Sequence, residues 1–279
     1  MPIHDQGYRH YGGTKARGRA WLVIFNAGFF GMIRNRKWIM LMIASWIQFI
    51  VRAVQFYIAA NFSQAAIVAP SAATFRDFFD KQDLFVFLVA VTLGAVSIAD
   101  DRRANALQIY LSKPLTRLEY ICGKLSVLMA FVLLITWVPA ILLLVVEVVF
   151  AGNFTFLLAN LYLIPAITVY SIIEALMVSM CILALSSLST NSRFVGILFT
   201  ALIFFSHALY QVMQAVTGGG TRVSWIAFGN NLAQLGDVIF RVPLRFETPW
   251  PVSLAIVVGL IGVSALILER RIRGVEIVA

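Results

Sequence analysis

The sequence predicts an all-α, polytopic membrane protein: a single transmembrane domain over residues 1–279 with six membrane-spanning helices. Composition is the first observation that predicts this class. Hydrophobic residues make up 61% of the chain and charged residues only 13%, and the mean hydropathy is +0.88. A soluble globule of this length needs more polar surface than that. The second observation is that the apolar residues gather in six stretches, as expected when about 20 apolar residues cross a bilayer.

The six predicted spans differ in how well they fit the thickness of a bilayer. They cover residues 38–60, 84–99, 120–149, 156–188, 193–214 and 250–269. The second span is short, with 16 residues between Asp83 and Asp100. It must borrow flanking residues or thin the bilayer locally. Pro139 and Pro165 are expected to kink the third and fourth spans.

The positions of the basic residues predict the topology. The net charge is +9 and 16 of the 22 Lys and Arg residues lie in alternate loops: before the first span, in residues 100–124, at Arg193 and in residues 270–273. Cytoplasmic loops carry such an excess of Lys and Arg. We therefore expect a multi-pass protein of the cell membrane, in a bacterium the inner membrane, with both termini cytoplasmic. Nucleic acid is not an expected partner, because these charges follow the topology instead of forming one basic face.

Two further segments are expected to lie at the membrane surface. The first, Trp21–Ile33, is too short to span, and it is followed by Arg34, Arg36 and Lys37 where a signal peptide would have a small-residue cleavage site. Basic residues flank it, so we expect an interfacial helix within a cytoplasmic N-terminus of residues 1–37. The second is the external segment 215–249, in which apolar residues recur at helical spacing from residue 225 to 240. It is expected to be an interfacial or re-entrant helix, and a hydrophobic plug under the outer leaflet is an equal alternative.

The charged cytoplasmic segment 100–119 has the features of a stiff connection between the second and third spans. Residues 101–111 can form about three helical turns, and Pro114 forbids their continuation because it lacks an amide proton. Thr116 and Glu119 fit a capping box, so the third span should start at about Arg117. A push on the short helix should therefore reach the membrane.

This segment resembles the one that permease subunits of type 2 ATP-binding-cassette (ABC-2) transporters present to their ATPase. The likeness is an acidic-basic cluster, a short helix, a Leu-Ser-x-Pro-Leu-x-Arg turn and Gly123-Lys124. By this resemblance, the residues that couple to the ATPase are expected to be Asp100, Asp101, Arg102, Arg103, Leu107, Gln108, Leu111, Ser112, Pro114, Leu115 and Arg117. One departure is Asn105-Ala-Leu-Gln108, where the family often has a Gly-Thr-Leu-Glu type of sequence.

The resemblance implies that the chain is the permease subunit of an exporter. Its expected partners are an ABC ATPase subunit, a second copy of itself or a related permease, and the lipid bilayer. No Gly-x-x-x-x-Gly-Lys-Ser/Thr sequence is present. We therefore expect no cofactor in this chain, with ATP and magnesium held by the partner subunit, and no catalytic or metal-binding residue.

Arg52, Glu174 and His207 are the ionisable residues deepest in the predicted spans. At 1.5 Å per residue, each lies about 21 Å from the cytoplasmic face. Such groups usually face the protein interior and pair. Our hypothesis is that Arg52 and Glu174 form an ion pair near His207 and line the translocation path or its gate. A purely structural pair, or an outward-snorkelling Arg52, is the alternative.

Two other functional classes stay open. A channel or secondary transporter needs a denser line of polar groups through the membrane than these three residues supply. An intramembrane enzyme needs a catalytic motif, and neither His-Glu-x-x-His nor Gly-x-Ser-x-Gly is present. The sequence does not indicate the substrate: ions, drugs, lipids, glycans and peptides all stay possible.

Overall fold

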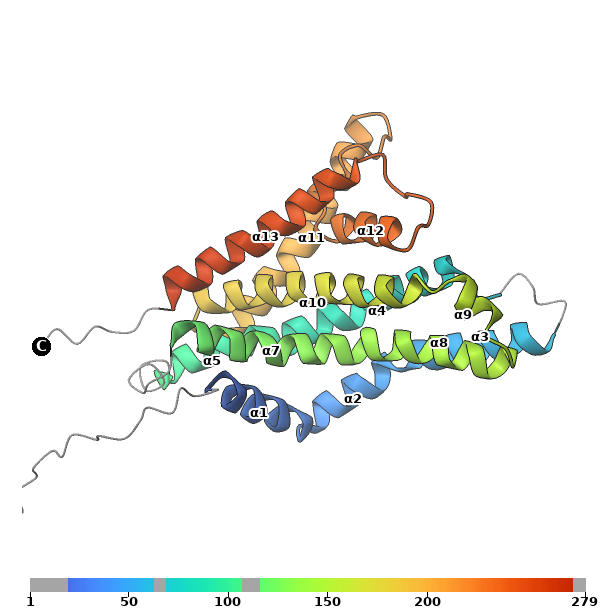
Figure 1. Cartoon of the computed structure of the whole chain (residues 1–279). Coiled ribbons are helices and arrows are strands. Elements are labelled where there is room, and N and C mark those ends of the chain that lie inside the picture. Colours follow the sequence, from blue (N-terminus) through green and yellow to red (C-terminus); the bar gives the residue numbers. More distant parts are fainter. Residues whose placement is uncertain (1–19, 63–68, 107–115, 273–279) are drawn as a thin grey trace, which may run out of the picture.

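The computed structural model describes residues 20–62, 69–106 and 116–272, and these residues form helices joined by turns, without a strand among them (Figure 1). Six helical segments are long and apolar enough to cross a membrane, as predicted. They form an elongated bundle. We call the end at which Arg103 and Arg117 lie the loop end, and the end at which Asn61 and Ala72 lie the far end.

The first span is divided into two helices. These are α2 (Arg36–Ser45) and α3 (Ile47–Asn61), which meet at Trp46. Before them comes α1 (Ala20–Ile33), so the predicted short N-terminal helix is present. It packs along α7 (Arg117–Ile135), where the rings of Phe29 and Phe131 stack with centroids 4.9 Å apart. The placement of α1 in a membrane interface stays a prediction.

The second span is twice as long as predicted. It runs without interruption through α4 (Ala72–Val89), a π-helical turn at Ala90–Gly94 and α5 (Ala95–Arg103), 32 residues in all. The predicted start at residue 84 is wrong because the charged residues before it lie within the helix. Ser71 caps the true start by accepting a hydrogen bond from the backbone amide of Thr74, at 3.3 Å.

The third span is interrupted close to Pro139, where a kink is expected. Helix α7 ends at Ile135, and α8 (Trp137–Ala151) follows after Thr136. Proline has no amide proton to give to the carbonyl four residues before it, here that of Ile135. The side-chain amide of Gln82 on α4 donates to that carbonyl instead. The interruption of the helix therefore provides a hydrogen bond that joins α4 to α7.

The fourth span, α10 (Leu163–Leu188), is the most buried of the six and packs against α5, α7 and α13. It starts later than predicted, because residues 155–159 form a separate helix, α9 (Thr155–Ala159). Pro165 lies in the first turn of α10, where no intrahelical partner for its amide exists, so it does not kink the helix.

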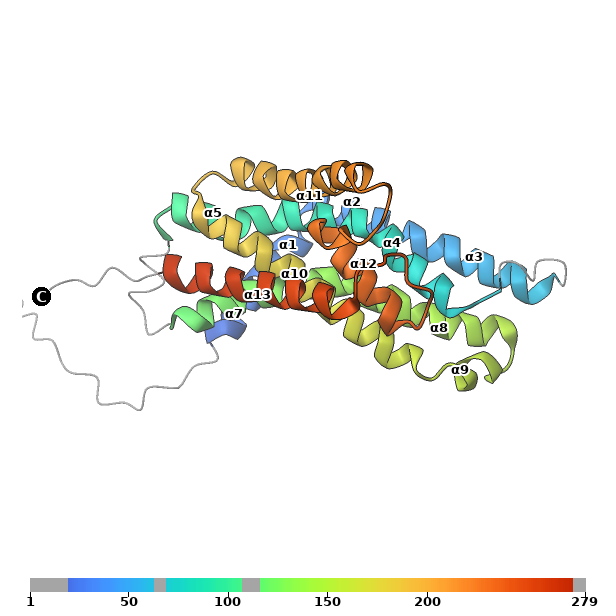
Figure 2. The ribbon, with the colours of Figure 1, turned by 90° about the horizontal axis from the view of Figure 1, so that it is seen from above.

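The remaining helices cover one side of α10, as the view from above shows (Figure 2). They are α11 (Ser192–Val216), a 3₁₀ turn (Ser224–Ile226), α12 (Phe228–Ile239) and α13 (Trp250–Arg271). Helix α12 lies within the range 225–240 that the apolar spacing predicts. It contacts α10, α11 and α13 and buries Phe228, Leu232 and Leu235.

Candidate functional site

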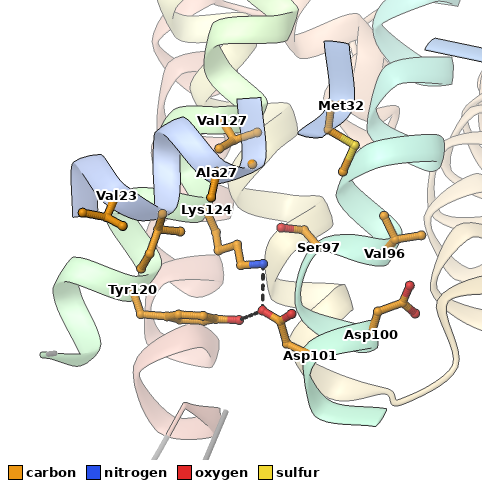
Figure 3. Close-up of a pocket in the computed structure, with 12 residues that line it drawn as sticks. Val23, Ala27, Met32, Val96, Ser97, Asp100, Asp101, Tyr120, Lys124 and Val127 are labelled. Carbon is orange, nitrogen blue, oxygen red and sulfur yellow. Dashed lines mark hydrogen bonds and ion pairs between the residues drawn. The ribbon is translucent and has the colours of Figure 1, made fainter. Parts of the chain in front are cut away.

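The base of the charged loop is held together by three side chains at the loop end (Figure 3). The carboxylate of Asp101, in the last turn of α5, lies 2.7 Å from the ammonium of Lys124 on α7. The hydroxyl of Tyr120 on α7 donates a hydrogen bond of 2.7 Å to the same carboxylate. We call Asp101, Tyr120 and Lys124 the clamp.

The sequence explains how α7 brings two clamp residues to one acid. Tyr120 and Lys124 are four residues apart and therefore lie on the same face of the helix. The helix itself starts as predicted: the Thr116 hydroxyl accepts from the Glu119 amide at 3.2 Å, and the Glu119 carboxylate accepts from the Thr116 amide at 3.0 Å. This capping box fixes the start of α7 directly below the loop.

The last turns of α5 are also tied to α10. The hydroxyl of Ser186 accepts from the amides of Ile98 and Ala99, at 3.1 and 2.9 Å, and donates to the carbonyl of Ala95 at 2.9 Å. The guanidinium of Arg102 donates to the carbonyl of Ser187. The helix that enters the loop is therefore attached to two neighbours, α7 through the clamp and α10 through these bonds.

A cavity of about 440 Å³ lies beside the clamp, between α1, α5 and α7 (Figure 3). Its walls are mostly apolar, with Ala27 and Met32 from α1 and Val127 from α7, while Asp100 and Lys124 add charge at one edge. The cavity separates α1 from α5. Helix α7 contacts α1 along its length and α5 through the clamp, so it can transmit a displacement of α5 to α1.

The structure places the predicted coupling residues in two groups. Asp100, Asp101, Arg102 and Arg103 form the last turn of α5, with Asp100 and Arg103 paired at 3.4 Å. A helix beginning at Asp101 is therefore wrong: these residues continue the membrane helix, which then stops at Asn105, whose φ of +52° is left-handed. Arg117 is the first residue of α7. The other predicted residues lie outside the described part of the chain: Leu107, Gln108, Leu111, Ser112, Pro114 and Leu115.

A second charged cluster, which the sequence analysis did not predict, lies at the far end. We call Arg76, Asp80, Asp237 and Arg245 the far-end cluster. Arg76 lies 2.8 Å from Asp80 and 3.2 Å from Asp237. Arg245 lies 2.8 Å from the same two carboxylates. The cluster joins α4 to α12 and to the loop of residues 240–249.

Burial and packing make the far-end cluster rigid. The Arg76 side chain is 3% exposed, Asp237 is fully buried, and the Arg76 guanidinium lies 5.0 Å over the ring of Tyr170 on α10. A side chain at Gly236 would collide with Arg76 and would come within 2.9 Å of Tyr170. Hydrogen bonding to Asp237, the largest effect, raises the pKa of Arg245, so its positive charge persists at any physiological pH.

The structure does not bring Arg52, Glu174 and His207 together. Arg52 pairs with Asp77 on α4 and donates to Gln55 at 2.8 Å, so its partner is another acid than the predicted Glu174. Glu174 is buried beside Asp83. His207 is exposed on α11 and lies 3.2 Å from Gln211. A function of these residues in a path or gate stays a prediction.

In the ranges that the structure describes, no group of three or more His, Cys, Asp or Glu residues is placed to hold a metal ion. The carboxylates of the clamp and of the far-end cluster pair with Lys and Arg instead. These charge pairs therefore connect helices to one another.

No protein-family model matches the chain, and no curated protein matches it significantly.

Proposed function

We propose that this chain is the membrane-spanning permease subunit of an ABC-2 type transporter, and that a separate ATPase subunit drives it. In this proposal the ATPase binds the segment 100–119, carries ATP and magnesium, and acts on a dimer of the chain or on the chain with a related permease. The chain itself is not catalytic. By the resemblance, transport is directed out of the cell.

The observation that carries the proposal is how the segment is attached. Two long membrane helices, α5 and α7, enter it, and both have well-defined ends: Asn105 stops α5 and the Thr116 capping box starts α7. The clamp links the two helices directly below it. A force applied to the segment therefore acts on α5 and α7 together, with few soft torsions between.

The length of the second span adds a second reason. Because α4, the π-helical turn and α5 form one 32-residue helix, a movement at Arg103 continues to Ala72 at the far end. The far-end cluster attaches that end to α12. A tilt of this helix, driven from the loop end, would change the contacts of α4 with its neighbours, as alternating access requires.

Co-purification tests the proposal. An epitope-tagged chain, expressed in cells that carry the full transporter, should retain an ATPase subunit that mass spectrometry identifies. The double variant Leu107→Glu, Leu111→Glu should lose it. Leu244→Glu is the matched control, because Leu244 is exposed in the loop of residues 240–249 at the far end. An ATPase that stays bound to the double variant would contradict the proposed contact.

A secondary transporter is the other candidate, and the structure offers one observation in its favour. The far-end cluster, Asp83 and Glu174 place more charge in the outer half of the bundle than the sequence alone predicted. Reconstitution of the purified chain in liposomes separates the two functions. Solute flux without the ATPase would favour a secondary transporter, and flux that requires the ATPase and ATP would favour the permease.

A further inference from the structure

An apolar pocket with two acidic residues lies between α4, α10, α11 and α12. Its volume is about 270 Å³, and its lining is hydrophobic except at Asp83 on α4 and Glu174 on α10. It is distinct from the clamp, which lies at the loop end, and from the far-end cluster, whose side chains do not line it. Neither feature accounts for acids placed in an apolar pocket.

Glu174 is the informative residue of this pocket. Its side chain is 1% exposed, and both carboxylate oxygens are buried without a hydrogen bond of standard geometry to any described residue. Its carboxyl lies within interaction range of Asp83, which is exposed toward the pocket. Two neighbouring carboxyl groups in an apolar site cannot both be ionised without a large cost, and a positive partner removes that cost, so the site favours a cation.

The nearest arginines do not supply that partner. Arg76 directs its guanidinium to Asp80 and Asp237, and Arg245 binds the same two carboxylates. The four charges of the far-end cluster balance one another. Both guanidinium groups are therefore bound to other carboxylates, and in the described part of the chain neither forms an ion pair with Asp83 or Glu174.

The pocket walls favour an organic cation. Four phenylalanine rings line the pocket and contact one another, with centroids 6.2 Å apart for Phe87 with Phe199 and for Phe199 with Phe228, and 6.4 Å apart for Phe87 with Phe204. Aromatic faces attract cations, and quaternary ammonium groups above all are bound this way. A calcium or magnesium ion needs six or more oxygen ligands, which this apolar lining does not offer.

We propose that this pocket binds a small lipophilic organic cation, with its ammonium group at Asp83 and Glu174 and its hydrocarbon or aromatic body among the phenylalanines. The proposed binding requires neither ATP nor a partner subunit. The proposed ligand class does not depend on the ATPase contact proposed for the segment 100–119. Binding is therefore measurable on the purified chain.

Phenyltrimethylammonium and its neutral isostere tert-butylbenzene are the matched probes. They have the same shape, so they differ in the charge that the two carboxylates would recognise. Binding is measured by equilibrium dialysis of radiolabelled probe against the full chain in lipid nanodiscs, and empty nanodiscs give the partition into lipid. The chain should bind the cation at least about tenfold more tightly than the isostere. Equal binding of the two, or no binding of the cation, would overturn the proposal.

Isosteric variants assign the effect to the two acids. Glu174→Gln and Asp83→Asn keep the side-chain volume, and each should weaken binding of phenyltrimethylammonium by about tenfold while leaving tert-butylbenzene unchanged. Glu247→Gln, which removes an exposed carboxylate outside the pocket, is the control and should change neither. Cation binding that survives both pocket substitutions would show that the carboxylates are not its counter-ions.

Discussion

The clamp and the far-end cluster hold opposite ends of the same long helix, and they differ in burial. At the far end, the Arg76 and Asp237 side chains are 3% and 0% exposed. At the loop end, the Asp101 and Lys124 side chains are 19% and 20% exposed. Removing one partner from a buried ion pair leaves an uncompensated charge, whereas a partly hydrated pair loses little.

This difference gives the two ends different mechanical properties. In the far-end cluster, the Arg76–Asp237 pair binds α4 to α12 by charges that water does not reach, so we expect this pair to keep its geometry. The clamp can open at modest cost, because water can reach its charges. A helix fixed at one end and adjustable at the other suits a lever driven from the loop, as the proposed coupling requires.

Breaking the far-end cluster should have the largest effect on stability. Asp237→Asn leaves Arg76 and Arg245 with Asp80 as their remaining carboxylate partner. The loss of a buried partner should lower the free energy of unfolding by about 3 to 5 kcal/mol. Equilibrium unfolding in mixed micelles measures it. Glu247→Gln is the control, because it breaks the exposed Arg222–Glu247 pair and should cost at most about 0.5 kcal/mol. Equal losses in the two variants would contradict the role of burial.

Local features of α7 and α8 could be predicted from the sequence, whereas the far-end cluster could not. The capping box at Thr116 and Glu119 depends on residues three apart, and the break near Pro139 depends on one missing amide proton. Both are confirmed. Arg76 and Asp237 are 161 residues apart, and no spacing rule relates them. The sequence contained only the weak signal of an Arg76–Asp80 pair at i, i+4.

The wrong boundary of the second span has the same cause. The charged residues at positions 76 to 83 were placed outside the span, just before its predicted start at residue 84, because the sequence does not reveal their partners. In the structure Arg76 pairs with Asp237, and Asp77 pairs with Arg52. The same unseen partners explain why Arg52 and Glu174 do not meet. The depth of an ionisable residue along a span indicates how costly its charge is in a membrane, but it does not identify which side chains face each other.

The clamp should show a smaller effect on stability and a larger effect on coupling. Asp101→Asn weakens both the ion pair with Lys124 and the hydrogen bond from Tyr120, and should lower the free energy of unfolding by about 1 to 2 kcal/mol. A double-mutant cycle with Lys124→Met isolates the pair. If the proposed function holds, ATP-driven transport should fall in Asp101→Asn while the ATPase stays bound. Full transport in this variant would show that the clamp is only structural.

The cap of α7 should have the smallest effect, and it separates a local contribution from one that couples two helices. Thr116→Ala removes the hydroxyl that accepts from the Glu119 amide, and an exposed cap of this kind is worth about 0.5 to 1 kcal/mol. Thr116→Ser is the control, since it keeps the hydroxyl and should retain most of that stability. Because the cap lies within α7, its loss should add to that of Asp101→Asn without interaction, as measured by unfolding of the double variant. A clear interaction between the two substitutions would mean that the start of α7 positions Tyr120 and Lys124 for the clamp, so that the loop end would act as one cooperative unit.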